Sequence, residues 1–415
     1  MTRIVVTGMG VMTSVGCNVE QFWSNLLSGV QGVKPIRSFP VANHPYKLGC
    51  EIEDLHAYSG AMNPAWGRAT RMFVTTVEDA LHDAGIRLPS LSLSVTGLAG
   101  SEGNKQNSAT ETGSSADSGP SRRIGLCIGT TMGELEALEE STQKPSRGRL
   151  AGPNMIAEYV TEELQLSGPV WTLTNACAAG NFAIARAVEE LVAGRADMMI
   201  AGGVDAMSWS AFTGFSSLRA MAPDVCRPFD AGRKGLLLGE GAGVVILETE
   251  EHAVRRGAVV QASLLGYGLG CDANHITQPD PEAEGAVHAM QRALTMAGLD
   301  KEQIGYVSAH GTGTLANDRM EAKALSRFFG PGIRTSSIKG HIGHTLGAAS
   351  AIEAVACIKA LETGILPPNL NLREKDPLCG VEVVANEPLP YRTEYMVSNA
   401  YAFGGINSTI VLGRA

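Results

Sequence analysis

The sequence predicts a layered α/β fold made of two similar halves. Short apolar runs bounded by glycine alternate with segments whose apolar residues recur at helical spacing, which is the pattern of βαβ units. This alternation starts again after about residue 265, as a repeat of element order rather than of sequence. The 49 glycines and only 5% aromatic residues fit tight strand–helix turns and close backbone packing. We therefore expect two closely packed halves, residues 1–265 and 266–415, and not separate domains on a linker.

The first half opens with the apolar run 3–7, which predicts a buried strand that ends at Gly8 and Gly10. Helices are expected over 21–27 and 70–84, because the apolar residues of the second share one face. Apolar residues also recur at helical spacing after Cys177, and they predict a helix there. Short apolar runs predict further buried strands at 123–129, 170–173, 198–203 and 242–247.

The second half repeats this order. Helical periodicity predicts helices over 283–297, 318–329 and 346–363. Strands are predicted between and after these helices, at 304–309, 333–337, 381–385 and 408–412.

One segment, 97–121, breaks the alternation. Small and polar residues dominate it, and it has no apolar periodicity. Such a composition cannot bury enough surface to offset the entropy of ordering the chain. The segment is therefore predicted to be an exposed flexible loop.

Composition excludes several classes of protein. Hydrophobic residues at 44% and charged residues at 18% are typical of a globular protein with a large core. The net charge of −9 argues against nucleic acid as the main partner, since phosphate binding favours a basic surface. No apolar stretch reaches the roughly 20 residues of a membrane span, and the N-terminal residues do not resemble a signal peptide.

The eight cysteines have no CxxC or CxxH spacing, so no metal site is predicted. Several lie in apolar or helical runs, as Cys357 does. Free thiols in such surroundings are typical of a reducing compartment, and a cytoplasmic location is expected.

Cys177 is the strongest candidate nucleophile. It lies among small residues, between a predicted strand and a predicted helix, where unpaired N–H groups and the positive end of the helix dipole favour thiolate. His310 and His344 each lie in a glycine-rich turn far along the chain. A nucleophilic cysteine needs imidazole partners that are distant in sequence and near in space. The three residues are predicted to share one site, although most cysteines of this kind are small core residues.

At this point the chain resembles a known family. The resemblance runs from Val5-Val6-Thr7-Gly8-Met9-Gly10 to the glycine turn at 398–407, and it includes the Cys177, His310 and His344 motifs in order. The family is the β-ketoacyl-acyl-carrier-protein synthases, elongating type II condensing enzymes of the thiolase superfamily. The resemblance implies a thiolase-like α-β-α-β-α fold and makes 97–121 an insertion. It also implies decarboxylative Claisen condensation without a cofactor, on acyl chains carried by the phosphopantetheine of an acyl carrier protein.

The resemblance assigns roles to the site residues. Cys177 would carry the acyl chain as a thioester, while His310 and His344 would donate hydrogen bonds to the enolate formed from malonyl thioester. Lys339 and Glu353 match a supporting charged pair that fixes the histidine loop. His341, between Lys339 and His344, is expected to be a local loop residue.

The backbone N–H groups of Cys177 and Phe403 would form the oxyanion hole, and Phe403 also matches a gating aromatic residue. Glycine after Phe403 permits the backbone conformation that aims this N–H inward. Ala402 and Ile406 differ from the residues more usual around this turn.

Four further residues match substrate-contacting positions. Thr312 and Thr314 match contacts to the pantetheine arm, with an ordinary turn hydroxyl as the alternative. Met132 matches an apolar position that lines the acyl pocket. Leu236 matches a position that borders the acyl pocket. Lys234 and Leu236 stand where aspartate and phenylalanine are commoner in the family. These differences favour an acyl substrate outside ordinary fatty-acid synthesis, with neutral packing changes as the alternative.

Partners also follow from the resemblance. An acidic acyl carrier protein would dock on a local basic patch, for which Arg68, Arg71 and Arg219 are candidates. Relatives build the acyl pocket across a two-fold interface, so a homodimer or a heterodimer with a chain-length-factor-like paralogue is expected.

Three other functions are compatible with some of these motifs. A thiolase uses a second cysteine near its C-terminus, but the turn at 400–405 has none and Cys379 lacks a glycine-rich context. A non-catalytic chain-length factor would lack Cys177. A housekeeping fatty-acid ketosynthase stays open beside the preferred type II polyketide or polyene ketosynthase.

Overall fold

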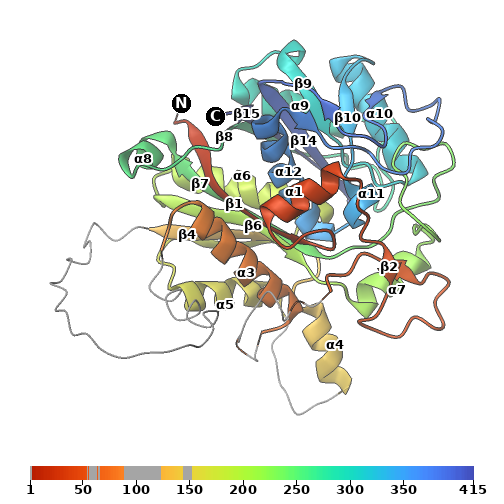
Figure 1. Ribbon diagram of the computed structural model, residues 1–415, viewed down its shortest axis with the longest axis horizontal. Helices are drawn as coiled ribbons and strands as arrows, with labels where there is room; N and C mark the ends of the chain where they lie inside the picture. The colour runs from red at the N-terminus through yellow and green to blue at the C-terminus, as the bar shows by residue number, and fades with distance from the viewer. Residues whose placement is uncertain (1, 54, 56–62, 64–65, 88–122, 144–151) are drawn as a thin grey trace, which may run out of the picture.

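The computed structural model describes residues 2–53, 55, 63, 66–87, 123–143 and 152–415 (Figure 1). The loop predicted at 97–121 lies outside these residues. One mixed sheet of eleven strands runs through the described part of the chain. Its N-terminal strands are β1 (Ile4–Thr13), β4 (Ile124–Gly129), β5 (Val170–Leu173), β6 (Met198–Asp205) and β7 (Gly241–Thr249). Its C-terminal strands are β8 (Ala262–Cys271), β9 (Ile304–Ser308), β10 (Arg334–Ser336), β12 (Glu382–Val383), β14 (Tyr395–Ala402) and β15 (Ile406–Arg414).

Each half of the sheet repeats the same strand order and direction. The N-terminal half runs β1-β7-β6-β4-β5, and the C-terminal half runs β8-β15-β14-β9-β10 and ends at β12. The first three strands of each half are antiparallel, and the pairs that follow are parallel. Antiparallel pairing of β1 with β8 joins the halves. The boundary predicted at residue 265 falls within β8, and the division into two closely packed halves at that residue stays a prediction.

Helices cover and separate the two halves. The helices α3 (Arg68–Asp83) and α5 (Asn154–Leu164) cover the outer face of the N-terminal half. Two helices, α6 (Ala179–Val192) and α12 (Ala349–Thr363), lie between the halves, and α9 (Glu284–Ala297) and α10 (Leu315–Phe329) cover the C-terminal half (Figure 1). This is the predicted α-β-α-β-α layering.

Shorter elements complete the described fold. The strands β2 with β3 and β11 with β13 form two small ribbons. The bounds of the remaining elements are β2 Lys34–Pro35, β3 Leu48–Gly49, β11 Ile365–Leu366, β13 Leu389–Pro390, α1 Val19–Leu27, α4 Leu135–Gln143, α7 Trp209–Ser217, α8 Glu250–Arg255 and α11 Lys339–Ile342.

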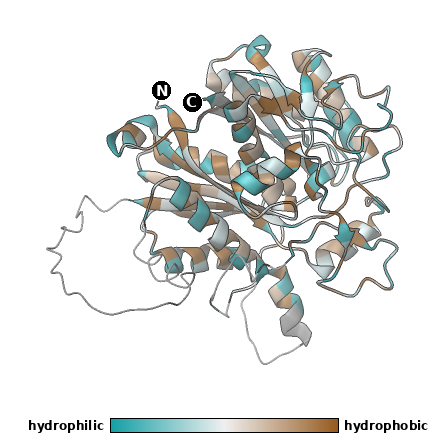
Figure 2. Ribbon diagram, viewed as in Figure 1, coloured by the Kyte–Doolittle hydropathy of each residue, from teal (hydrophilic) through white to brown (hydrophobic). Residues whose placement is uncertain are grey.

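The core lies between the layers. Hydrophobic residues concentrate on the strands and on the helix faces that pack against them (Figure 2). Helix α12 is buried on nearly every side as far as Leu361, because it lies between the two halves of the sheet. Burial on every side allows a helix with few polar positions, and the sequence of α12 fits this.

Two predicted strands differ from the observed ones. Strand β1 continues through Gly8 and Gly10 to Thr13 instead of ending there. A Cβ at Gly8 would lie 2.3 Å from the Ala80 carbonyl oxygen, and one at Gly10 would lie 2.1 Å from that of Thr76. The glycines therefore let α3 pack closely on β1 rather than closing a turn. Strand β5 was predicted to be buried, but it is an edge strand on which Val170 and Trp171 are 40% and 42% exposed.

All eight cysteines are free thiols in the structure. Among the residues that the structure describes, no helix is long and apolar enough to cross a membrane.

Candidate active site

Cys177 lies in a 3₁₀ turn, Ala176–Ala178, between β5 and α6. Ala176 has a φ of +49°, in the left-handed region that costs a non-glycine residue conformational energy. The following helix crosses α12 closely, since a Cβ at Gly180 would lie 2.8 Å from the backbone nitrogen of Ala351. The Asn181 N–H donates to Ser350 Oγ at 2.9 Å across this crossing. The close approach brings the N-terminal ends of α6 and α12 together and places Cys177 beside the turn that carries His344.

His310 follows β9, and a buried carboxylate holds its backbone. The N–H groups of His310 and Gly311 donate to the two carboxylate oxygens of Glu321 in α10, each at 2.8 Å. Burial raises the pKa of Glu321 to about 8, although these two hydrogen bonds favour its charged form. The direction in which His310 leaves the strand is therefore set by Glu321.

His344 lies between α11 and α12. Its N–H donates to the Leu237 carbonyl at 2.6 Å, and its Nδ1 accepts the Leu346 N–H at 3.3 Å. A neutral imidazole that accepts at Nδ1 carries its proton on Nε2. The polypeptide therefore holds His344 in the tautomer that can donate a hydrogen bond from Nε2.

Asp205, at the end of β6, anchors the turn after His344. Its carboxylate accepts the Gly347 N–H at 2.6 Å, the Thr130 hydroxyl at 2.8 Å and the Met132 N–H at 2.8 Å. This buried residue joins β6, the loop after β4 and the start of α12. Neither Asp205 nor Glu321 is among the site residues predicted from the sequence. The position of Asp205 directly after a buried strand was the available signal.

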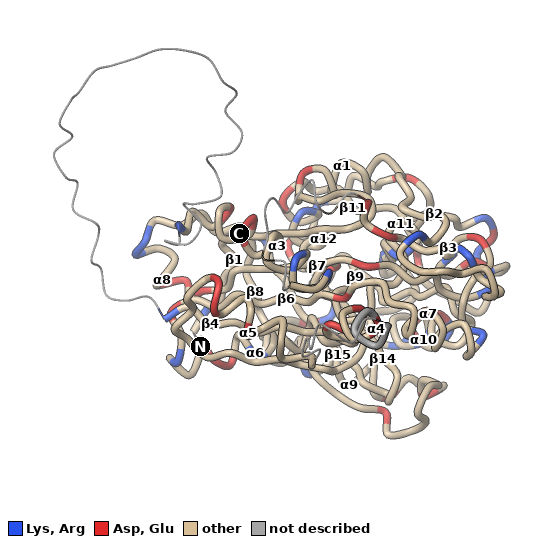
Figure 3. The backbone as a smooth tube through the Cα atoms, turned by 90° about the horizontal axis from the view of Figure 1, so that it is seen from below, with Lys and Arg blue, Asp and Glu red and all other residues tan. Residues whose placement is uncertain are grey.

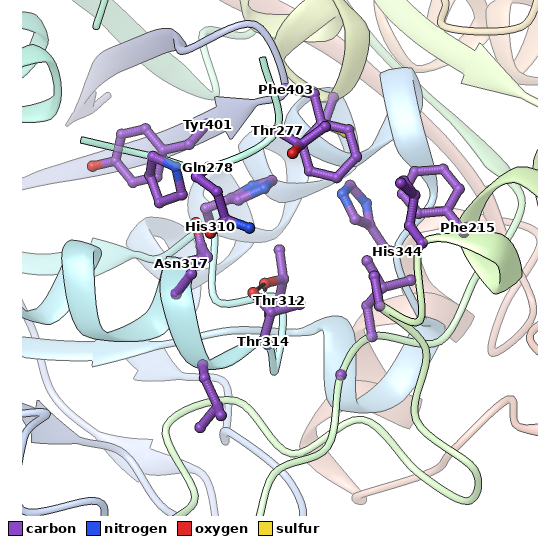
Figure 4. Close-up of a pocket in the computed structure, with 18 of the residues that line it drawn as sticks. Phe215, Thr277, Gln278, His310, Thr312, Thr314, Asn317, His344, Tyr401 and Phe403 are labelled. Carbon is purple, nitrogen blue, oxygen red and sulfur yellow. Dashed lines mark hydrogen bonds between the residues drawn. The ribbon is translucent and has the colours of Figure 1, made fainter. Parts of the chain in front are cut away.

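The three predicted catalytic side chains line one cavity of about 360 Å³. The rings of His310 and His344 meet edge to face, with centroids 5.3 Å apart and planes at 82°. Figure 4 shows both imidazoles at this cavity, with Phe215 and Phe403 beside His344 and with Thr312 and Thr314 below. The fold therefore brings together three residues that are up to 167 positions apart in sequence (344 minus 177).

Lys339 and Glu353 form a buried ion pair behind the histidines, and each side chain is 1% exposed. The Lys339 ammonium also lies 3.4 Å from Nδ1 of His310, toward which it donates. His310 consequently carries its own proton on Nε2, as His344 does. Burial raises the pKa of Glu353 to about 7, while the charge of Lys339 lowers it.

Burial and the charge of Lys339 keep both imidazoles neutral. Burial is the largest cause that lowers the pKa of His310 and of His344 well below the ordinary value, and Lys339 adds to it. Burial also raises the pKa of the Cys177 thiol to about 12, against a lowering by Lys339. The expected preference for thiolate is therefore wrong for the resting site, because desolvation outweighs the favourable end of the helix.

Phe403 lies in the turn between β14 and β15. Gly404 and Gly405 follow it with φ of +83° and +72°, a conformation that favours glycine. The Phe403 ring is 38% exposed and stacks on Phe215 at 5.9 Å and 25°. Phe403 lines the cavity. Its predicted roles in the oxyanion hole and in gating stay predictions.

The predicted substrate contacts divide into two groups. Thr312, Thr314 and Leu236 line the cavity, and the two threonine hydroxyls lie 2.9 Å apart. Lys234, for which no contact was predicted, lines the cavity as well. Met132 does not line it and packs instead in the adjoining apolar cluster around Phe212 and Leu236.

The remaining residues singled out from the sequence lie elsewhere. His341 is buried outside the cavity lining, with its ring nitrogens 3.0 Å from the carbonyl oxygens of Val30 and Pro368. Arg68 is bound to the buried carboxylate of Glu240, so its charge is not free for a docking partner.

Charges of both signs occur together over much of the surface, as around β2 and β3, where Lys34 pairs with Glu53 at 2.7 Å (Figure 3). Arg71 donates to the Trp66 carbonyl at 3.1 Å, whereas Arg219 is exposed and lines the cavity. In the described ranges no group of three or more His, Cys, Asp or Glu residues is arranged to hold a metal ion.

Comparison with known families identifies the protein class. The model for the N-terminal domain of β-ketoacyl synthases matches residues 1–253, and the model for the C-terminal domain matches residues 261–373. Nodulation protein E of Rhizobium meliloti (strain 1021) is 35% identical over 98% of each chain. The 3-oxoacyl-[acyl-carrier-protein] synthase 2 of Coxiella burnetii is 33% identical over 99% of this chain and 98% of the relative.

Solved structures agree with this result. The ishigamide ketosynthase/chain length factor superposes with a TM-score of 0.88 at 34% identity, covering 100% of this chain and 99% of the other. A type II PKS acyl-carrier protein in complex with its ketosynthase gives a TM-score of 0.85 at 26% identity and covers 100% of each chain.

The chain belongs to the β-ketoacyl synthase family and has its thiolase-like fold. It is an acyl-transferring condensing enzyme, a β-ketoacyl-acyl-carrier-protein synthase. The family and the fold that we predicted from the sequence are confirmed.

Proposed function

We propose that the protein extends acyl chains by loading them onto Cys177 and condensing them there with malonyl-carrier protein. The observation that carries this proposal is the cavity in which Cys177 meets two neutral imidazoles, each held with its proton on Nε2. A nucleophile beside two hydrogen-bond donors suits a reaction that first forms a thioester and then develops negative charge on an oxygen.

In the loading step, the Cys177 sulfur attacks the carbonyl carbon of the acyl thioester on the carrier. A new C–S bond forms, the bond to the pantetheine sulfur breaks, and the thiol proton passes to the departing thiolate. Because burial keeps Cys177 protonated at rest, proton removal has to accompany the attack. The N–H groups of Cys177 and Phe403 are our candidates for stabilising the oxyanion of the tetrahedral intermediate.

In the condensing step, the C–C bond to the malonyl carboxylate breaks and CO2 leaves. Its electron pair forms an enolate whose oxygen accepts hydrogen bonds from Nε2–H of His310 and His344. The enolate carbon then attacks the Cys177 thioester, and the cysteine leaves as thiolate and takes up a proton. This step yields β-ketoacyl-carrier, CO2 and the Cys177 thiol, while the free carrier thiol was released in the loading step. Decarboxylation supplies the carbanion, so this reaction needs no cofactor.

The pathway is proposed to be that of a type II polyketide or polyene. Similarity to the ishigamide ketosynthase/chain length factor and to a ketosynthase bound to a type II PKS acyl-carrier protein supports this choice. The Coxiella burnetii 3-oxoacyl synthase favours fatty-acid elongation as the second candidate. Cys177 argues against a non-catalytic chain-length factor.

An acyl carrier protein and a second ketosynthase-like subunit are the proposed partners. The β5 edge supports the second subunit: this strand pairs with β4 alone among the described strands, and Val170 and Trp171 beside the open edge are about two-fifths exposed. An exposed apolar strand edge is a surface onto which another chain can add. Light scattering should find a dimer, either alone or with a co-encoded paralogue, and a folded, active monomer would contradict this.

The proposed function is tested by incubating the protein with radiolabelled acyl carriers of different chain types, with and without a co-encoded paralogue. Acyl-enzyme on Cys177, and β-ketoacyl product with CO2 after malonyl-carrier is added, are the expected results. Transfer without condensation would contradict the proposal. Preference for saturated housekeeping chains would favour the fatty-acid alternative.

A further inference from the structure

The wall of the catalytic cavity is positively charged although the whole chain carries a net charge of −9. Arg219, Arg233 and Lys234 line the cavity, whereas no described Asp or Glu does. A cavity lined by one sign of charge attracts ligands of the opposite sign. The question is which of the three cations has charge free to bind such a ligand.

Arg233 is committed to the protein itself. Its guanidinium is fully buried, 2.8 Å from Asp376 and 3.3 Å from Asp318. It also donates to the Asp230 carbonyl at 2.7 Å. Two carboxylates balance its charge, so Arg233 supports the cavity wall and leaves no excess charge there.

Arg219 and Lys234 differ from Arg233 in their exposure and in their partners. Both side chains are exposed at the cavity, and neither forms an ion pair with any residue that the structure describes. The charge of Lys234 helps to lower the pKa of Asp224, but that carboxylate is held by Arg227 at 2.6 and 2.9 Å. Two cations at the cavity therefore lack a partner.

The backbone places Arg219 and Lys234 on two segments that are hydrogen-bonded to each other. Met221 and Leu236 form a parallel bridge, and Arg219 and Lys234 each precede a member of this bridge by two residues. The Leu236 N–H donates to the Ala220 carbonyl at 2.9 Å, which ties the two segments together. Like charges on neighbouring segments repel, and an anion bound to both offsets this repulsion.

The same segment also touches the predicted pantetheine contacts. The Gly235 N–H, next to Lys234, donates to the Gly313 carbonyl at 3.0 Å, between Thr312 and Thr314. The two threonine hydroxyls and the two free cations thus belong to one connected stretch of cavity wall. A ligand that binds these hydroxyls therefore lies in a cavity whose wall also carries the two cations.

We propose that Arg219 and Lys234 form a binding site for the phosphodiester of the phosphopantetheine arm. The inference rests on the proposed function, in which the substrate is a carrier-bound thioester. Lysine and arginine both bind phosphate oxygens through charge-assisted hydrogen bonds. Recognition of the phosphate would favour carrier-bound substrates over free thioesters before any contact with the carrier surface is made.

The test compares 4′-phosphopantetheine with pantetheine, which differ only in the phosphate, as protectants of Cys177 against iodoacetamide. We expect the phosphorylated compound to protect the wild-type protein at a lower concentration. The ratio of the two protecting concentrations is the advantage that the phosphate gives. Each of Arg219→Gln and Lys234→Gln should shrink this advantage by about two- to fivefold, as expected for exposed ion pairs, and the double variant should shrink it further. Added salt should shrink it as well.

Three controls sharpen the test. Lys234→Arg should restore the advantage, because it restores the charge. Lys301→Gln removes an exposed cation outside the cavity lining and should leave the advantage unchanged. Labelling of Cys177 without a protectant confirms in each variant that the site is folded.

Equal protection by the two compounds, or an advantage that survives in the double variant, would overturn the inference. This readout needs no acyl transfer. Phosphate-dependent protection without acyl transfer from acyl-phosphopantetheine would overturn the proposed function and leave the phosphate site standing, so the two failures are distinguishable.

Discussion

The Lys339 ammonium lies 3.4 Å from Nδ1 of His310 and is paired with Glu353, so one buried cation contacts both a carboxylate and a histidine of the cavity. Its charge lowers the pKa of His310, of His344 and of Cys177. A single positive charge therefore favours neutral imidazoles and, at the same time, a more reactive thiol.

Cys177→Ala should abolish acyl-enzyme formation, because it removes the nucleophile and little volume. Intact-mass spectrometry after incubation with acyl-carrier protein checks this, and circular dichroism checks the fold. An acyl adduct on the variant would show that another residue is the nucleophile. CO2 release from malonyl-carrier should persist, since both histidines remain.

His310→Ala and His344→Ala should each slow malonyl decarboxylation by roughly a hundredfold or more, because removing one preorganised donor to an oxyanion costs about 3 kcal/mol. Loading of Cys177 should fall much less. Assays of CO2 release and of radiolabelled acyl loading, run side by side, separate the two steps. His288→Ala, on an exposed face of α9, is the matched control. Equal loss of both steps in the His344 variant would instead identify His344 as the base that activates Cys177.

As the pH falls from 8 to 6, the rate of decarboxylation should follow only Glu321 and Glu353, whose pKa values burial raises to about 8 and about 7, and not the two histidines. Burial lowers the pKa of both imidazoles well below 6.5, so they remain neutral donors throughout this range. The CO2 release rate of Cys177→Ala with saturating malonyl-carrier measures this step without loading. A fall in rate with a midpoint near pH 6.5 would mean that the histidines titrate as exposed ones do.

Iodoacetamide should label Cys177 faster as the pH rises, about tenfold per unit between pH 7 and 9. Burial raises the pKa of the thiol to about 12, so the thiolate fraction grows without reaching a plateau in this range. Peptide mapping of Cys177 over time gives the rate. A plateau below pH 8 would indicate a thiolate that is stable at rest.

Variants of Lys339 and Glu353 should shift the pKa of Cys177 in opposite directions. Lys339→Met removes the cation that lowers the pKa of Cys177, so labelling at fixed pH should slow. Glu353→Gln removes a carboxylate that raises this pKa, so labelling should speed up. Changes in the same direction in both variants would point to a packing defect instead of electrostatics, and circular dichroism of each variant would reveal it.

Much of the fold followed from local patterns. Helical periodicity placed α3, α9 and α12 within a few residues of their observed bounds, and short apolar runs located β4, β6 and β7. The patterns did not locate β8 and β14. Tyr267 and the glycines at 266, 268 and 270 give β8 little apolar alternation, and the glycines at 266 and 268 face the backbone of α9 too closely for a side chain.

The candidate site was likewise only partly predictable from the sequence. The sequence by itself was enough to predict Cys177, His310 and His344 as the catalytic candidates, because each lies in a motif whose residue types are local. Only the tertiary structure decided their protonation and the supports that orient them. Asp205 and Glu321 act through backbone N–H groups of distant segments, and the thiol of Cys177 is governed by burial between α6 and α12. Desolvation depends on every layer of the structure that packs around a group, so no local sequence pattern predicts it.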